Sequence, residues 1–230
     1  MKAAKYSLIN DYMLENMHAC DGAHDAEHVL RVLGVALDIA AHEEGVDMDV
    51  LIAACLLHDI GRREQALNPA VCHAAAGAQK AQAFLEKHGF GEEFARRVAD
   101  CIRTHRFRGK GARPESVEAR ILFDADKIDV CGAIGVARTL LYQGRTGERL
   151  YGLCANGCIS DGVGDACASF FQEYRYKLEG VAQRLFTSRG RQIALERQPA
   201  ARAFYEAMLQ EVRFSREDAQ KRLAACLQEA

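Results

Sequence analysis

The chain has 230 residues, of which 49% are hydrophobic, and its formal net charge is −2 at pH 7. Three prolines, no tryptophan and abundant Ala, Leu, Arg and Glu are typical of a folded, mostly helical protein. The small net charge argues against a protein that wraps extended nucleic acid, although local basic clusters remain able to hold phosphates. The apolar runs are too short to cross a bilayer and the N-terminus lacks a signal-peptide core, so we expect a cytoplasmic protein whose nine cysteines are mainly reduced.

Hydrophobic residues recur at helical spacing along the whole chain, and no segment alternates over more than a few positions. This periodicity predicts an all-α protein. A long helix is predicted to open near Ala23, and in it His28 shares one stripe with Val32, Val35 and Ile39. His28 is therefore expected to face the core, whereas His24 lies at the helix entrance, where capping or contact with water is the more common role.

A histidine and an aspartate, His58-Asp59, directly follow an apolar run. With Asp47 as the N-cap, residues 50–59 are predicted to form a helix that points His58 inward, and Gly61 is placed to stop it. Asp59 would then carry a negative charge in the last turn, where the helix macrodipole and the loss of solvent both disfavour it. A divalent metal ion beside Asp59 resolves this conflict, although such doublets are more often surface pairs or satisfied core histidines.

Two further histidines are predicted to lie at helix ends. His73 falls in the first turn of a predicted helix from Val71 to Gly89, a position that commonly meets solvent. His105 ends the clearest apolar stripe of the sequence, in a predicted helix that begins at Glu92. Five basic residues surround His105: Arg103, Arg106, Arg108, Lys110 and Arg113. They form either a solvated loop or, if a metal ion lies nearby, a site that binds phosphate.

Three carboxylates lie within residues 124–129 of another predicted helix. The apolar period places Asp126 deepest among them, where an unpaired charge would cost several kcal/mol. Asp126 is therefore expected to be a ligand or a paired core acid. Lys127 is turned by about 100° around the helix, so it is able to pair with Asp124 or Asp129, or to reach a substrate anion.

The remainder of the chain is predicted to cover this core. A long, glycine-rich loop follows residue 141, and amphipathic helices are predicted over about residues 165–214. Cys154 and Cys158 in this loop lack the spacing and partner histidines of a structural zinc site. We therefore predict one domain over residues 1–230, with its core at about residues 20–140.

The inward-facing polar residues together form a ligand set of imidazoles and carboxylates without thiolate. The set consists of His28, His58, Asp59, His73, His105 and Asp126. Such ligands suit Mn, Fe, Co, Ni or Zn and, with more water, Mg, so the set alone does not identify the ion. Four of these ligands are enough for one ion, and six are enough for two.

The order of these residues resembles the HD-domain superfamily of metal-dependent phosphohydrolases, whose pattern is a histidine, a histidine-aspartate doublet and a later aspartate. Here the pattern falls on His28, His58-Asp59 and Asp126, and the flanking residues are similar to the small bacterial HD hydrolases. The resemblance covers about residues 20–214 and implies a single helical HD-domain bundle with extra C-terminal helices. His73 and His105 resemble the two intervening histidines of dinuclear HD enzymes.

The resemblance implies hydrolysis of a phosphomonoester or phosphodiester in a nucleotide or other small phosphorylated metabolite, with one or two divalent ions per chain. In this hypothesis the catalytic residues are Asp59, His105 and Lys127. The substrate-binding residues are Arg106, Arg108 and Lys110. The alternatives are an HD-type di-iron oxygenase and a non-catalytic nucleotide-sensing module. The sequence does not determine the oligomeric state.

Overall fold

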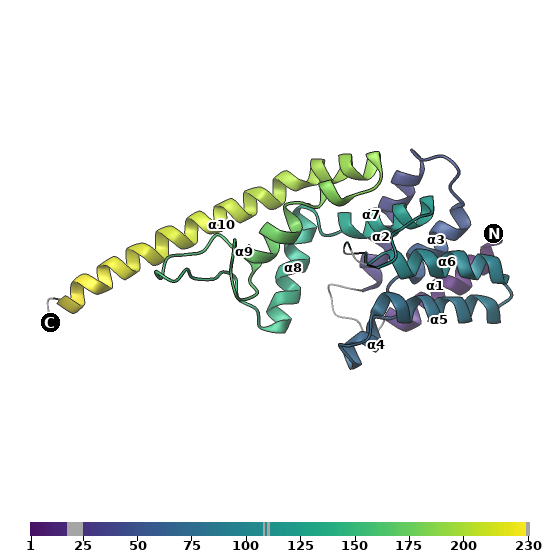
Figure 1. The fold of residues 1–230 in the computed structure, drawn as a ribbon, viewed down its shortest axis with the longest axis horizontal. Coiled ribbons are helices and arrows are strands. Elements are labelled where there is room, and N and C mark those ends of the chain that lie inside the picture. Colours follow the sequence, from purple (N-terminus) through teal and green to yellow (C-terminus); the bar gives the residue numbers. More distant parts are fainter. Residues whose placement is uncertain (18–24, 108, 110, 229–230) are drawn as a thin grey trace. The chain divides into compact units, whose positions relative to one another are not determined.

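Helices form every regular element in the part of the chain that the computed structural model describes, which is residues 1–17, 25–107, 109 and 111–228 (Figure 1). Within these ranges extended backbone pairs only at isolated bridges, between Arg149 and Ser169 and between Leu153 and Ile159. The predicted all-α class is therefore confirmed. His24, Arg108 and Lys110 lie outside the described residues.

The chain divides into two compact units, and the first comprises Met1–Asp129 and Ala182–Ile193. Its helices are α1 (Ala3–Met17), α2 (Ala26–Ala40), α3 (Met48–Leu57), α4 (Arg62–Leu67), α5 (His73–Lys87), α6 (Glu92–Thr104) and α7 (Val117–Ile128), followed by a 3₁₀ turn at Ala182–Arg184. Helix α5 packs against α6, helix α2 packs against α7, and α3 contacts all of α1, α2, α6 and α7. The core of this unit is therefore arranged around α3.

The sequence explains why α3 occupies the centre. It is apolar on all sides, and from Val50 to Leu57 every residue except Ile52 is buried. A helix without a polar face is stable only where other elements surround it. Asp47 caps it as predicted, because its side chain accepts hydrogen bonds from the backbone N–H groups of Asp49 and Val50.

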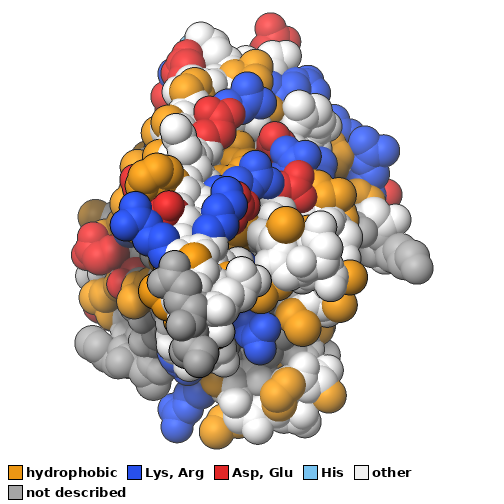
Figure 2. Space-filling model, turned by 90° about the vertical axis from the view of Figure 1, so that its left-hand side faces the viewer, with side chains coloured by type: hydrophobic (Ala, Val, Ile, Leu, Met, Phe, Trp, Pro, Cys, Tyr) orange, Lys and Arg blue, Asp and Glu red, His pale blue; other side chains and the backbone are white. Residues whose placement is uncertain are grey.

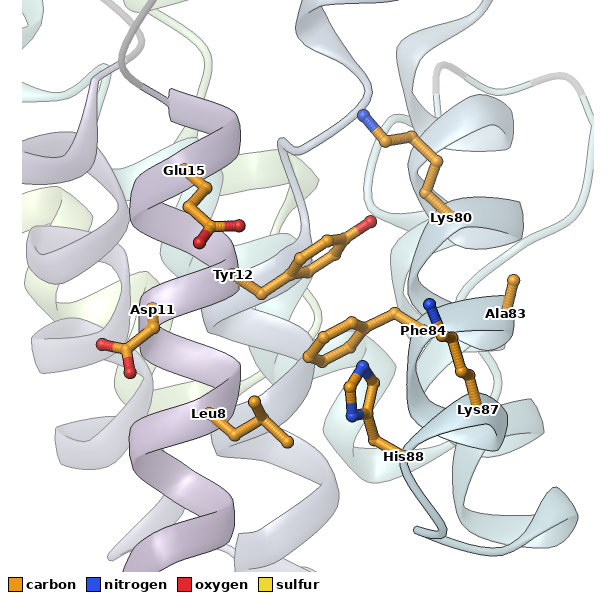
Figure 3. Close-up of a pocket in the computed structure, with 9 residues that line it drawn as sticks. All are labelled: Leu8, Asp11, Tyr12, Glu15, Lys80, Ala83, Phe84, Lys87 and His88. Atoms are coloured by element: carbon orange, nitrogen blue, oxygen red, sulfur yellow. The ribbon is translucent and has the colours of Figure 1, made fainter.

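Helix α1 docks on α5 through a pair of aromatic rings. The rings of Tyr12 and Phe84 stack with centroids 3.8 Å apart and an interplanar angle of 5°. A surface groove of about 550 Å³ opens beside this stack. Figure 3 shows the residues that line it, which are Leu8, Asp11, Tyr12, Glu15, Lys80, Ala83, Phe84, Lys87 and His88. The groove contains none of the predicted metal ligands, and its rim carries charges of both signs.

Two carboxylates hold residues 182–193 against the rest of the first unit. Asp124 is fully buried and accepts hydrogen bonds from Phe186 N at 2.9 Å, Thr187 N at 2.7 Å and Thr187 Oγ1 at 2.6 Å. Asp38 forms a bidentate salt bridge with Arg189, with N–O distances of 2.7 and 2.8 Å. Asp124 is thus a structural acid that anchors the return of the chain.

The second unit comprises Val130–Val181 and Ala194–Ala230. Helix α8 (Gly132–Thr146) leads into an irregular segment, which is followed by α9 (Phe170–Glu173), a π-helical turn at Tyr174–Leu178 and most of α10 (Ser188–Gln228). Its core is aromatic, and Tyr174 stacks on Tyr205 with centroids 4.1 Å apart. That the two units belong to one domain over residues 1–230 stays a prediction.

The helix boundaries differ from the predicted ones in two places. The predicted helix that holds the three carboxylates of residues 124–129 ends at Ile128 as α7, so Asp129 follows it, and Gly132 begins α8 with φ +67°. The amphipathic helices predicted over about residues 165–214 are α9, the π-helical turn and the first part of α10, which contains Pro199 and continues to Gln228. Acidic and basic residues are intermixed along α10. Figure 2 shows Lys and Arg interspersed with Asp and Glu on the face in view. Among the described residues, none of the helices combines the length and hydropathy needed to span a membrane.

Candidate metal centre

Four histidines at helix ends converge on Asp59. His28 lies in the first turn of α2 and His73 opens α5, whereas His58 and His105 follow the last residues of α3 and α6 as C-caps. All four rings are buried, and so is the Asp59 carboxylate, with only 1% of the residue exposed. The structure therefore brings together five of the six predicted ligands in a site closed to bulk solvent.

His58 and His105 owe their orientation to the same local arrangement. The Nδ1 of each ring lies within hydrogen-bond distance of the carbonyl oxygen three residues earlier, at 2.8 Å from Cys55 O and 2.6 Å from Ile102 O. A carbonyl oxygen only accepts, so Nδ1 must carry the proton. In a neutral ring Nε2 then presents a lone pair to the centre of the site.

His28 and His73 are oriented by side chains. His28 Nδ1 lies 2.7 Å from Asp129 Oδ2, and His73 Nδ1 lies 2.8 Å from Gln65 Oε1. Both partners are oxygen acceptors at neutral pH, so these rings also direct an unprotonated Nε2 inward. Arg31 fixes the Asp129 carboxylate with two hydrogen bonds of 2.9 and 3.1 Å.

The inward nitrogens form two groups that share Asp59. Asp59 Oδ2 lies 3.6 Å from His28 Nε2 and 3.7 Å from His58 Nε2. The other oxygen, Oδ1, lies 3.5 Å from His73 Nε2 and 3.7 Å from His105 Nε2. One carboxylate thus faces two pairs of imidazoles, which is the arrangement of a bridging ligand.

Several of these buried atoms make no hydrogen bond in the part of the chain that the structure describes. Within the described residues, both Asp59 oxygens and the Nε2 atoms of His73 and His105 make no hydrogen bond. The Nε2 atoms of His28 and His58 are 3.3 Å apart, although each presents a lone pair. Unsatisfied acceptors and facing lone pairs are unfavourable in a buried site, and a divalent cation relieves both costs. The residues therefore fit a metal ion.

The protonation states of the histidines and of Asp59 also suit a metal ion. Burial lowers the pKa of His73 to about 2 and that of His105 to about 4, so both rings are neutral at pH 7. Burial acts to raise the pKa of Asp59, but Arg62, whose Nε lies 3.0 Å from Oδ2, outweighs it and holds that pKa well below its usual range. Neutral imidazoles around an ionised carboxylate are the protonation states that metal ligands need.

The placement of the three acids on α7 corrects the sequence prediction. The Asp126 side chain is 14% exposed and is not the deepest, because Asp124 and Asp129 are 0% and 1% exposed. Asp126 nevertheless reaches the cluster, with Oδ1 3.5 Å from His28 Nε2. Hydrophobic periodicity did not predict which acid is buried most deeply, because each of the three has its own polar partner on a different side of the helix.

The basic residues around the cluster were only partly anticipated. Lys127 pairs with Asp126, a partner that the sequence did not suggest, and its Nζ lies 2.7 Å from Asp126 Oδ2 and 3.3 Å from His105 O. Arg106 lies beside Cys72, the residue before His73. Arg62, which opens the short helix α4, was not among the predicted site residues.

The partners of the histidines were also missed. Arg31 lies three residues after His28 and Arg62 lies three residues after Asp59, so one-turn spacing was an available signal for both. Asp129 is 101 residues from His28 in the sequence, and no local pattern links the two. No local pattern links Gln65 to His73 either, because Gln65 contacts this ring from another helix.

Gly61 is required by close packing at this site and not by helix termination. Helix α3 ends at Leu57, and Gly61 has φ −90°, a conformation open to any residue. A β-carbon at Gly61 would overlap the carbonyl oxygen of His73 and lie 2.5 Å from Gly77 N. The absence of a side chain lets α5 approach the His58-Asp59 turn.

We therefore expect Gly61→Ala to lower the free energy of unfolding by about 1–3 kcal/mol through overpacking. Urea denaturation monitored by circular dichroism measures this change. The matched control is Gly34→Ala in α2, where no atom lies within 4 Å of the added carbon. That substitution removes a helical glycine and should stabilise the protein by about 0.5–1 kcal/mol. Equal effects of the two substitutions would contradict the packing role of Gly61.

Comparisons with known proteins agree with this geometry. Residues 25–131 match the family model of the HD domain. The Bacillus subtilis protein YpgQ is 33% identical over 132 residues, which are 56% of this chain, and the match covers 62% of the length of YpgQ.

Solved structures show the same fold. An HD-superfamily hydrolase from Bacillus thuringiensis has a TM-score of 0.67 and 26% identity, with 92% of this chain and 98% of that chain covered. YpgQ crystallised in complex with ADP has a TM-score of 0.69 and 23% identity, with 90% and 97% covered. The HD-domain match spans His28, His58-Asp59, His73, His105 and Asp126, the residues that the structure gathers around one buried carboxylate. The chain therefore contains an HD domain over residues 25–131.

Proposed function

We propose that the protein is a metal-dependent phosphohydrolase acting on a nucleotide or other small phosphorylated metabolite. The observation that supports this most is the buried cluster in which four Nε2 atoms and both Asp59 oxygens face a common space. Such a donor set serves metal-assisted hydrolysis. The similarity to an HD-superfamily hydrolase points to the same reaction class.

The ligands divide between two ion positions. We assign His28, His58, Asp59 and Asp126 to the first position, and Asp59, His73 and His105 to the second. A bound divalent ion polarises a phosphoryl oxygen and increases the acidity of water. Asp59 belongs to both positions, so its carboxylate would hold either ion and would help to orient the attacking nucleophile.

The basic residues supply the charge that a phosphate needs. Arg106 lies near the second position, and Lys127 Nζ lies between Asp126 and the carbonyl of His105. Lys127 is placed to neutralise charge on a phosphoryl group beside Asp126, and Arg106 is placed to bind a neighbouring phosphate. Arg108 and Lys110 are assigned to the same role from the sequence. The ADP complex of YpgQ supports a phosphorylated small molecule as the substrate class.

The test is metal analysis of protein purified without added metal, followed by a screen of nucleotides and sugar phosphates with Mn, Co, Ni or Mg. Release of phosphate or pyrophosphate by the parent protein, but not by Asp59→Ala, is expected. Iron in the purified protein, together with oxygen consumption, would instead identify a di-iron oxygenase. Tight nucleotide binding without product after long incubation would identify a sensing module.

A further inference from the structure

The four histidine ligands differ in the group that their Nδ1 atom contacts, on the side of the ring away from the ion positions. His58 and His105 donate to backbone carbonyls, and His73 donates to the neutral amide of Gln65. Only His28, among these four, is paired with a carboxylate, that of Asp129. A carboxylate partner increases the electron density on the ligating nitrogen more than a neutral acceptor does. His28 is therefore the strongest imidazole donor in the site.

The Asp129 carboxylate is also the more rigid of the two side-chain partners. It is 1% exposed and is fixed by two hydrogen bonds from Arg31. Gln65 is half-buried and lies on α4, a helix of only six residues. A ligand whose partner is locked in place loses less conformational freedom when it binds an ion.

The charges around the two positions also favour tighter binding of a cation at the first position. The first position has two carboxylates in contact with its ligands, Asp59 and Asp126, and Asp129 stands directly behind His28. The second position has only the shared Asp59 carboxylate, and Arg106 acts on its ligand His73. Arg62 contacts Asp59 Oδ2 and also acts on His73, so it opposes a cation at both positions. Electrostatics therefore favour a cation more strongly at the first position.

We propose that the two ion positions have unequal affinity, and that Asp129 and Gln65 are the positioning residues that set it. Asp129 makes the position of His28, His58, Asp59 and Asp126 the tight one by holding His28. Gln65 holds His73 in the weaker position of Asp59, His73 and His105. This inference rests on the metal site of the proposed function and extends it to how that site is filled.

The experiment is titration of the full-length, metal-free protein with Mn²⁺, followed by isothermal calorimetry and checked by equilibrium dialysis. For the parent we expect two steps of one ion each, separated by at least about tenfold in affinity. Asp129→Asn should weaken the tight step by about 10- to 100-fold and leave the weak step in place. Gln65→Met should weaken only the weak step, by about tenfold.

Matched controls are Asp11→Asn and Gln79→Met, two exposed positions on α1 and α5 that contact no ligand. Both steps should be unchanged in these controls. If Asp129→Asn does not fold, Arg31→Gln provides the second variant, because it removes the clamp but keeps the carboxylate beside His28. It should weaken the same tight step by a smaller factor, with the thermal midpoint of the metal-free protein as the check on folding.

Two equal steps in the parent would overturn the proposal, as would an effect of Asp129→Asn on the weak step or of Gln65→Met on the tight one. A single step of one ion would overturn it as well, while leaving a one-metal hydrolase possible. Failure of the parent protein to bind Mn²⁺ or any other divalent ion would contradict the proposed function itself. The two failures are therefore distinguishable.

Discussion

Asp59→Ala is expected to abolish metal binding at both positions and to reduce phosphohydrolase activity by at least about a thousandfold, because it removes several kcal/mol of transition-state stabilisation. Asp59 is the ligand common to both groups, and each of its oxygens faces two Nε2 atoms. Without it, the first position keeps only Asp126 as an anionic ligand, and the second keeps none. Neutral imidazoles alone hold a divalent ion weakly in competition with water.

Metal content after dialysis, measured on the purified protein, checks this result. The thermal midpoint gives a second measurement, because an ion that binds only the folded state raises it for the parent protein but not for the variant. Asp11→Ala, at an exposed position of α1, is the matched control and should retain full metal content. Metal content in Asp59→Ala equal to that of the parent would show that this carboxylate is not a ligand.

The sequence was most informative where periodicity and chemistry agreed. His28 shares a stripe with apolar residues of α2, and all of them are buried as predicted. The apolar stripe of α6 leads directly to His105, and Asp47 caps α3. In each case the relevant information lies within a few residues, because helical spacing alone determines which side chains share a face.

The sequence was least informative where a residue is defined by a distant partner. Asp124, Asp126 and Asp129 lie within six residues of each other, yet they contact the segment at Thr187, the His28 imidazole and the Arg31 guanidinium. Their partners are 63, 98 and 98 positions away in the sequence, respectively. A period of 3.6 residues ranks side chains by direction alone, so it cannot distinguish a ligand from a structural acid or from the partner of a ligand.

Helix ends at the site were also difficult to predict, because tertiary contacts override local preference there. Gly61 was expected to stop a helix, but the structure uses it to let Gly77 and the His73 carbonyl come close. Helix α4 was not predicted, and it brings Gln65 to His73. Both features depend on the packing of α5, which lies beyond the range of local sequence signals.

His105→Ala and His73→Ala are each expected to lower the metal content from about two ions per chain to about one. Each substitution removes one of the two imidazoles that face Asp59 Oδ1. The position of His28, His58 and Asp126 keeps its own ligands, so the remaining ion should bind as tightly as before. In the structure the Nε2 of His73 points inward and makes no hydrogen bond to any described residue, as that of His105 does, whereas from the sequence His73 was known only to lie in a first helical turn.

Elemental analysis of the parent and both variants decides between two roles for these histidines. If they orient the phosphate instead of binding an ion, metal content should stay near one in all three proteins and only turnover should fall. His42→Ala is the matched control, because its side chain is 55% exposed and contacts only Asp38 in the hydrogen bonds and ion pairs described. One ion per chain in both the parent and His105→Ala would contradict the dinuclear site, since the two unsatisfied Nε2 atoms would then have to be satisfied by water or by substrate.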